Sequence, residues 1–284
     1  MKLITCKVKD STPFVGVLSD NNVYKLDFPG STMTDYIKSG IAIEDTLKQL
    51  DSAQSFDLSE VEILSPIPEP VQDIVCLGMN YTAHAAEAKG FNDAFDKKDA
   101  AVYFSKRASY CQGPGGIIPA HENLASMLDY EVELAVVIGK DAFNVSPEDA
   151  EEYIFGYTIL NDVTAREVQT KHNQWYFGKS FDGFTPMGPW IVTKDEISFP
   201  PALTIQSYIN GELRQNSNTS NLIHSIPEII SELSAGMTLK AGTIIATGTP
   251  EGVGMGMNPP TFLKPGDEVK CFIEGIGELV NIVK

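Results

Sequence analysis

Apolar and polar residues alternate with the two-residue period of β-strands over most of the chain. Helical periodicity is confined to short segments, and the sequence has neither a regular strand–helix–strand alternation nor a repeat of fixed period. The pattern predicts an α+β fold rich in β-structure. Expected strands include 3–7, 14–18, 23–26, 73–78, 129–139, 157–160, 204–209, 243–248, 267–272 and 279–283, and expected helices include 33–38, 43–49, 80–90, 147–153, 164–169 and 226–233.

A connector with three alternating prolines, Leu64–Pro70, follows the first group of short strands and helices. Proline fixes its own backbone and pushes the preceding residue into an extended conformation, so this segment is a stiff spacer. We therefore expect two domains, a small N-terminal α+β domain over residues 1–68 and a larger domain over residues 69–284.

The longest apolar strand, 129–139, opens with three acidic residues at alternate positions, Asp129, Glu131 and Glu133. Alternate residues of a strand share a face, so these carboxylates point the same way and lead into a run that belongs in a core. Buried carboxylates need compensation, and a divalent cation provides it. A solvated edge strand with acidic outward positions is the open alternative.

Asp162 adds another carboxylate at the exit of the predicted strand 157–160. Three oxygen-donor side chains, Glu131, Glu133 and Asp162, would leave part of an octahedral shell open for water or substrate oxygens. Such a shell suits a hard ion, so the sequence indicates a site for Mg²⁺ or Mn²⁺.

Two further groups of residues are candidates for chemistry. His84 and Glu87 lie three apart on a predicted helix and so share a face, where the carboxylate would orient the imidazole as a base. An exposed His–Glu pair is the alternative. Lys179 follows the aromatic run Trp175–Phe177, and it either faces a pocket and binds a carboxylate or extends to solvent. The glycine-rich segment Thr247–Gly254 would let backbone N–H groups approach an anion.

The charge, the cysteines and the absence of certain motifs disfavour several classes of function. The 284 residues carry a formal net charge of −17, which argues against nucleic acid or anionic membrane as a general partner. The four cysteines are scattered without a CxxC pair, no secretory segment opens the sequence and no apolar run would span a bilayer. A cytoplasmic protein with free thiols is expected. A serine hydrolase and a nucleotide site are disfavoured, because neither a Gly-x-Ser-x-Gly nor a GK[ST] motif occurs.

Several motifs in order make the chain resemble the fumarylacetoacetate hydrolase superfamily from about Asp73 to the C-terminus. One departure follows Lys106, where family members often carry proline and this chain has Arg107. The motifs that carry the resemblance are Gly78-Met79-Asn80-Tyr81 with His84 and Glu87, Asp129–Leu134, Asn161–Arg166, Lys179–Gly183 and Thr247–Gly254.

The resemblance implies a mixed β-sandwich roll, a homodimer, and Mg²⁺ or Mn²⁺ at the site. By position, Glu131, Glu133 and Asp162 correspond to the metal ligands. His84 and Glu87 correspond to a catalytic pair on a lid that orders over the substrate, and the lid is expected to span residues 83–100. The residues that line the substrate pocket in the family correspond to Arg166, Gln169, Lys179 and Thr249. Lys179 is also expected to be catalytic.

The resemblance also implies a small anionic keto-acid substrate and chemistry through a metal-stabilised enolate. Three reactions stay open: hydrolysis of an acylpyruvate-type C–C bond, decarboxylation of oxaloacetate, and isomerisation or tautomerisation. The first two rank close together and ahead of the third. A metal-binding protein of the same fold without turnover is the alternative outside enzymes.

Overall fold

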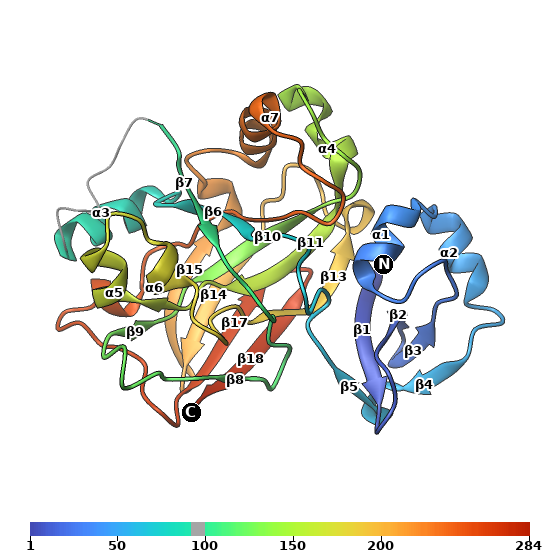
Figure 1. The fold of residues 1–284 in the computed structure, drawn as a ribbon, viewed down its shortest axis with the longest axis horizontal. Helices are drawn as coiled ribbons and strands as arrows, with labels where there is room; N and C mark the ends of the chain where they lie inside the picture. The colour runs from blue at the N-terminus through green and yellow to red at the C-terminus, as the bar shows by residue number, and fades with distance from the viewer. Residues whose placement is uncertain (92–99) are drawn as a thin grey trace.

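The structure is a computed structural model that describes residues 1–91 and 100–284. Strands predominate over helices, which confirms the β-rich α+β class (Figure 1). The helices are α1 (Met33–Ser39), α2 (Ile43–Gln49), α3 (Thr82–Phe91), α4 (Ala150–Tyr153), α5 (Arg166–Lys171), α6 (Tyr176–Lys179) and α7 (Ile226–Gly236). The strands are β1 (Lys2–Val8), β2 (Phe14–Ser19), β3 (Asn22–Lys25), β4 (Ser55–Asp57), β5 (Val61–Ile63), β6 (Ile74–Gly78), β7 (Val102–Lys106), β8 (Ile117–Ile118), β9 (Leu128–Asp129), β10 (Val132–Ile138), β11 (Ile154–Asn161), β12 (Thr164–Ala165), β13 (Met187–Thr193), β14 (Thr204–Ile209), β15 (Glu212–Asn218), β16 (Ile244–Ala246), β17 (Glu268–Ile273) and β18 (Gly277–Val283).

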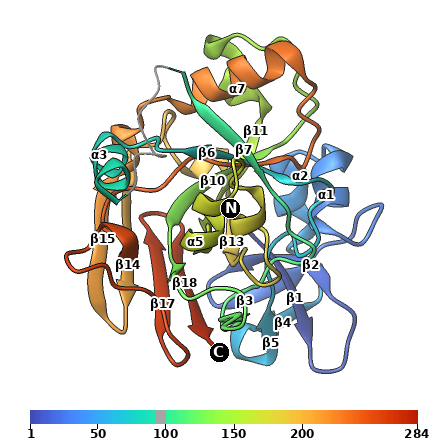
Figure 2. The ribbon, with the colours of Figure 1, turned by 60° about the vertical axis from the view of Figure 1, so that its left-hand side comes forward.

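The larger sheet runs in the order β4-β3-β2-β1-β13-β11-β10-β16-β6-β7, with β5 paired to β1. A smaller sheet, β15-β14-β17-β18-β8, stands beside its central strands (Figure 2). Apolar side chains of β10 alternate between two cores: Leu134 and Val136 pack in the core that includes β14 and β18, while Ala135 and Val137 pack on the opposite side. Both faces of β10 are therefore buried, as its apolar sequence predicts.

The N-terminal strands β1–β5 lie at one end of the molecule and helix α3 lies at the other (Figure 1). Strand β1 pairs with β13 through Lys2 and Val192, so the large sheet runs from the N-terminal region into the rest of the chain. The division into domains 1–68 and 69–284 stays a prediction. Among the described residues, no helix is long and apolar enough to cross a membrane.

Two local expectations are corrected. The strand predicted over 129–139 is two strands, β9 and β10, because the chain leaves the regular ladder at Tyr130 and Glu131. The helix predicted over 80–90 is α3, which begins at Thr82, because the Asn80 side chain instead bonds the backbone of His224 and the Thr247 carbonyl. Of the lid expected over 83–100, residues 92–99 lie outside the described part of the chain.

Candidate metal centre and its cavity

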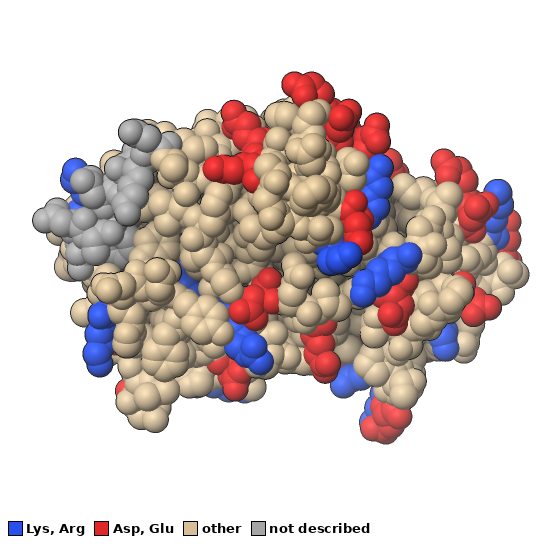
Figure 3. Space-filling view, turned by 45° about the horizontal axis from the view of Figure 1, so that its top comes forward, with Lys and Arg blue, Asp and Glu red and all other residues tan. Residues whose placement is uncertain are grey.

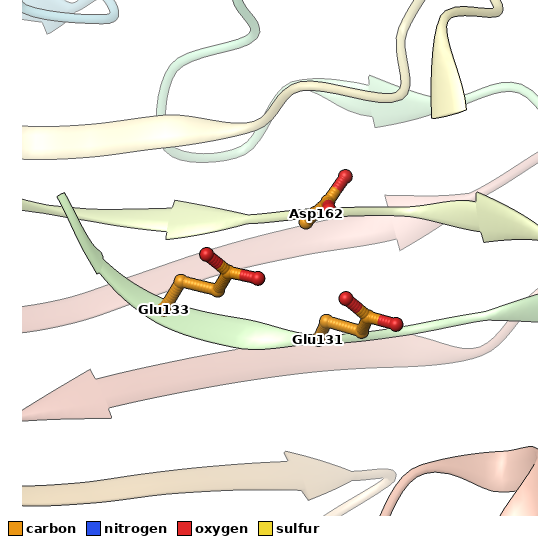
Figure 4. Close-up of side chains that lie close together, drawn as sticks. All are labelled: Glu131, Glu133 and Asp162. Atoms are coloured by element: carbon orange, nitrogen blue, oxygen red, sulfur yellow. The ribbon is translucent and has the colours of Figure 1, made fainter. Parts of the chain in front are cut away.

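Three buried carboxylates converge where β10 begins and β11 ends. The two strands are antiparallel, and Val132 pairs with Asn161, so Glu131 and Glu133 lie beside Asp162. One oxygen from each carboxylate lies within 4.8 Å of the others, and the three groups face one another in Figure 4. All three residues are buried, which rules out the solvated edge strand. Their role as metal ligands stays a prediction.

Two cations border this cluster from α5 and α6. Lys179 Nζ lies 2.8 Å from Glu131 Oε2 and 2.6 Å from Asp162 Oδ2, and Arg166 Nη1 lies 2.7 Å from Glu131 Oε1. Burial alone would raise the pKa of Glu131, but Lys179 and Arg166 hold it at about 2. Lys179 is buried, so the alternative that its ammonium extends to solvent is wrong.

A third cation, Lys106, was not predicted as a site residue. It is fully buried at the end of β7, and its Nζ lies 2.7 Å from Asp162 Oδ1. In the sequence it ends an ordinary apolar strand and has no acidic residue at a helical or strand spacing. Only the packing of β7 against the loop after β11 brings it to Asp162.

Asp129 lies near the cluster and has different partners. It accepts hydrogen bonds from Arg166 Nε at 2.8 Å and from the backbone N–H groups of Gly254 and Met255. Asp129 is not among the carboxylates that group as a possible metal site, although it precedes Glu131 and Glu133 at the same two-residue spacing. Asp129 instead fixes Arg166, whose other end reaches Glu131.

The charges in this region fit a divalent cation. Four buried carboxylates, those of Asp129, Glu131, Glu133 and Asp162, face three buried cations. The remaining negative charge is felt at Glu133, whose pKa is raised well above its usual value by burial and by the neighbouring Asp162 and Glu131. Carboxylate oxygens are the donors that Mg²⁺ and Mn²⁺ prefer, so the residues suit such an ion.

His84 and Glu87 pair on α3 at the edge of the same cavity. His84 Nδ1 lies 3.1 Å from Glu87 Oε2, while Glu87 Oε1 accepts a hydrogen bond from the Gly252 N–H at 3.0 Å. His84 is 4 % exposed, which rules out a surface pair. A Cβ at Gly256 would lie 1.9 Å from the Glu87 carboxylate, so glycine is required for this close approach. The outer carboxylate thus fixes the imidazole in place.

A cavity lies in front of these groups. All substrate-binding residues proposed from the sequence line this cavity. The Thr249 hydroxyl, however, donates its proton to the Val132 carbonyl and accepts a hydrogen bond from Gln215 Nε2. That hydroxyl has no proton left for an anion. Gln215, which was not predicted as a site residue either, donates to the Thr249 hydroxyl and accepts from the Val132 N–H. The cavity is lined by Leu77, Gly78, Met79, His84, Ala88, Phe104, Glu131, Arg166, Gln169, Trp175, Lys179, Thr249 and Met255.

Comparison with known proteins places these features in one family. Residues 73–284 match the family model described as fumarylacetoacetate (FAA) hydrolase, C-terminal. The chain is 49 % identical over 226 residues to the oxaloacetate tautomerase YisK of Bacillus subtilis, a match that covers 80 % of this chain and 74 % of that protein.

Solved structures agree over the whole chain. A fumarylacetoacetate hydrolase from Exiguobacterium antarcticum superposes with a TM-score of 0.87 at 38 % identity, over 100 % of this chain and 99 % of that one. Maleylpyruvate hydrolase from Sphingobium sp. SYK-6, solved with manganese(II) and pyruvate, gives a TM-score of 0.79 at 29 % identity, over 100 % and 98 %. The expected fold is confirmed, and the chain belongs to the fumarylacetoacetate hydrolase family.

Proposed function

We propose that this protein is a divalent-metal-dependent enzyme that forms the enolate of small 2-keto acids, and that keto–enol tautomerisation of oxaloacetate is its reaction. One observation carries the proposal: the buried cluster Glu131, Glu133 and Asp162 reaches, through Glu131, a cavity that His84 also lines. The similarity to an oxaloacetate tautomerase supports the choice of reaction. It moves tautomerisation ahead of the two reactions that the sequence alone ranks higher.

A Mg²⁺ or Mn²⁺ ion held by Glu131, Glu133 and Asp162 would supply Lewis-acid stabilisation of negative charge on the keto oxygen. Arg166 would bind the carboxylate of the substrate, because its Nη2 is buried without a hydrogen-bond partner and its side chain lines the cavity. Gln169 lies beside it, with Oε1 accepting from Arg166 Nη1 at 3.1 Å. Lys179 would place its ammonium next to the developing negative charge.

His84 would move the proton at C3 of the substrate. Its Nδ1 faces Glu87, so Nε2 is the nitrogen free to exchange a proton with the substrate. Glu87, held by the Gly252 N–H, would keep the imidazole oriented and stabilise its protonated form.

The charge of the site supports an anionic substrate although the protein as a whole is acidic. Acidic side chains gather along the upper edge of the face in Figure 3. In the buried site, one divalent cation added to four carboxylates and three basic side chains would leave a net positive charge. The local field would then attract a small dicarboxylate.

Hydrolysis of an acylpyruvate-type C–C bond is the second candidate. A maleylpyruvate hydrolase has the same fold with manganese and pyruvate bound, and the His84–Glu87 pair has the partners that a water-activating base needs. Decarboxylation of oxaloacetate ranks third. It needs the metal-stabilised enolate and no activated water, so the His84–Glu87 pair does not specifically favour it.

The test follows the enol absorbance of oxaloacetate with the purified protein, Mg²⁺ or Mn²⁺, and a chelator control. Accelerated ketonisation that the chelator removes and added metal restores is the expected result. Pyruvate formation from oxaloacetate would identify decarboxylation, and acid release from acetylpyruvate or fumarylpyruvate would identify hydrolysis. Metal binding without turnover of any of these substrates would favour a binding protein. The homodimer and the cytoplasmic location stay predictions.

A further inference from the structure

Lys106 is a buried lysine that none of the proposed steps uses. It ends β7, where Ile74 of β6 pairs with it, and its side chain has no exposed surface. Phe104, two residues earlier on the same strand, lines the cavity, and Lys106 is not among the described residues that do. The ammonium therefore lies behind the carboxylate cluster, where no substrate reaches it.

The Lys106 ammonium has one ion-pair partner and two backbone acceptors. Nζ lies 2.7 Å from Asp162 Oδ1, donates to the Val163 carbonyl at 3.2 Å, and donates to the Lys179 carbonyl at the end of α6. A fully buried lysine is rare unless its charge is paired; here the charge is paired with Asp162, and the ammonium also donates to two backbone carbonyls. One ammonium thus joins β7 to the loop after β11 and to the end of α6.

Through these contacts Lys106 holds two residues of the site, Asp162 and Lys179. Asp162 has a lysine on each oxygen: Lys106 on Oδ1 and Lys179 on Oδ2. Because Lys106 holds Oδ1, the carboxylate keeps Oδ2 toward Lys179, whose ammonium also contacts Glu131 Oε2. The same ammonium holds the backbone of Lys179, so the lysine that faces the cavity starts from a fixed position.

We propose that Lys106 is a positioning residue, which sets the carboxylate of Asp162 for the metal and the backbone of Lys179 for the substrate without touching either ligand. This inference rests on the proposed function. Outer partners of metal ligands typically contribute 10–100-fold, roughly, to metal affinity or activity. A purely electrostatic role has the opposite sign for the metal, because removal of a positive charge beside Asp162 would tighten cation binding.

The experiment compares Lys106→Met, which keeps length and removes all donors, with Lys106→Gln, which keeps a neutral donor. Calorimetric titration with Mn²⁺ should show affinity weakened by about 10-fold or more in the Met variant and partly recovered in the Gln variant. At saturating Mn²⁺ and with oxaloacetate, kcat should fall more than KM rises. Tyr36→Phe, which removes a buried hydrogen bond to Thr46 at the other end of the molecule, controls for general destabilisation.

Unchanged or tighter Mn²⁺ binding in Lys106→Met would overturn the proposal, and so would equal affinities for the Met and Gln variants. Should the Met variant fail to fold, the Gln variant against wild type decides, since it must bind Mn²⁺ measurably more weakly while Tyr36→Phe does not. Wild-type protein that binds Mn²⁺ and turns over no keto acid would overturn the proposed function alone. The affinity comparison would still test Lys106.

Discussion

The cavity has two sides that are built in different ways. The carboxylate floor consists of Glu131, Glu133 and Asp162, which stand where β10 and β11 meet, between β16 and β13 in the middle of the large sheet. The α3 wall consists of His84 and Glu87 on one helix. Strands with partners on both sides hold the floor, whereas α3 buries only His84, Ala85 and Ala88.

Within the described residues, the wall meets the rest of the chain at the glycine-rich segment and the turn that follows it. Ala88 packs with Val253 and Met255 in a small separate cluster, and Glu87 bonds the Gly252 N–H. Regions with little buried apolar surface open locally at lower free energy than core strands do. The difference indicates two separate roles. The floor would bind metal and substrate with side chains that keep their positions, while the wall would bring the proton-transferring group to the substrate and then move away from the floor.

The largest effect is expected at the floor. Glu131→Ala should abolish turnover and weaken Mn²⁺ binding by more than ~100-fold, because loss of an outer partner alone typically costs up to that amount. The fold should survive, since the sheet does not depend on this carboxylate. Calorimetry with Mn²⁺ measures the change, and unchanged affinity would remove Glu131 from the ligand set.

Asp129→Asn is the matched control for that variant. Asp129 is equally buried and only two residues away, but its carboxylate contacts Arg166 and two backbone N–H groups. This variant should lower the unfolding temperature and keep Mn²⁺ affinity close to that of wild type.

The next effect concerns the wall and separates the reaction types. His84→Ala should lower hydrolysis of acetylpyruvate on the order of 10²–10⁴-fold if His84 activates water. Oxaloacetate decarboxylation should fall less, because the floor is intact. Lys179→Ala should lower the rates with both substrates. Steady-state rates at saturating Mg²⁺ measure this, and equal losses on both substrates in His84→Ala would favour a shared role such as proton transfer at C3.

A smaller effect is expected where the wall meets the glycine-rich segment. In Gly256→Ala the new methyl group would overlap the Glu87 carboxylate and push the His84–Glu87 pair away from the floor. We expect kcat/KM to fall on the order of 10-fold, below the roughly 100-fold that a 1 Å misplacement can cost. Gly236→Ala in α7, where a methyl group meets no atom within 4 Å, is the control. Equal kinetics in the two variants would contradict the required close approach.

The smallest and most direct test measures local opening. Amide hydrogen exchange of α3 should be faster than that of β10 without ligand and should slow when oxalate and Mg²⁺ are added. Exchange in β10 should change little, because its strand neighbours already protect it. Equal protection of α3 with and without ligand would count against a closing wall.

Local spacing in the sequence determined a large part of the site. Glu131 and Glu133 flank one apolar residue at the start of a buried strand, so their spacing places them together; Asp162 follows the next strand and joins them only through the pairing of β10 with β11. His84 and Glu87 pair through helical spacing. The turn at Asn210-Gly211 between β14 and β15 is also local, since both residues take the positive φ that this dipeptide permits. These features depend on neighbours a few residues apart.

Tertiary structure decided the partners that lie far apart in the chain. Lys106 reaches Asp162 across 56 residues only because the fold brings the end of β7 to the loop after β11. Gln215 donates a hydrogen bond to the Thr249 hydroxyl because the smaller sheet lies against β10. Asp129 accepts hydrogen bonds from Gly254 and Met255, which lie 125 and 126 residues further along the chain. No periodicity encodes such contacts, because burial of a polar side chain depends on which surfaces the whole fold brings together.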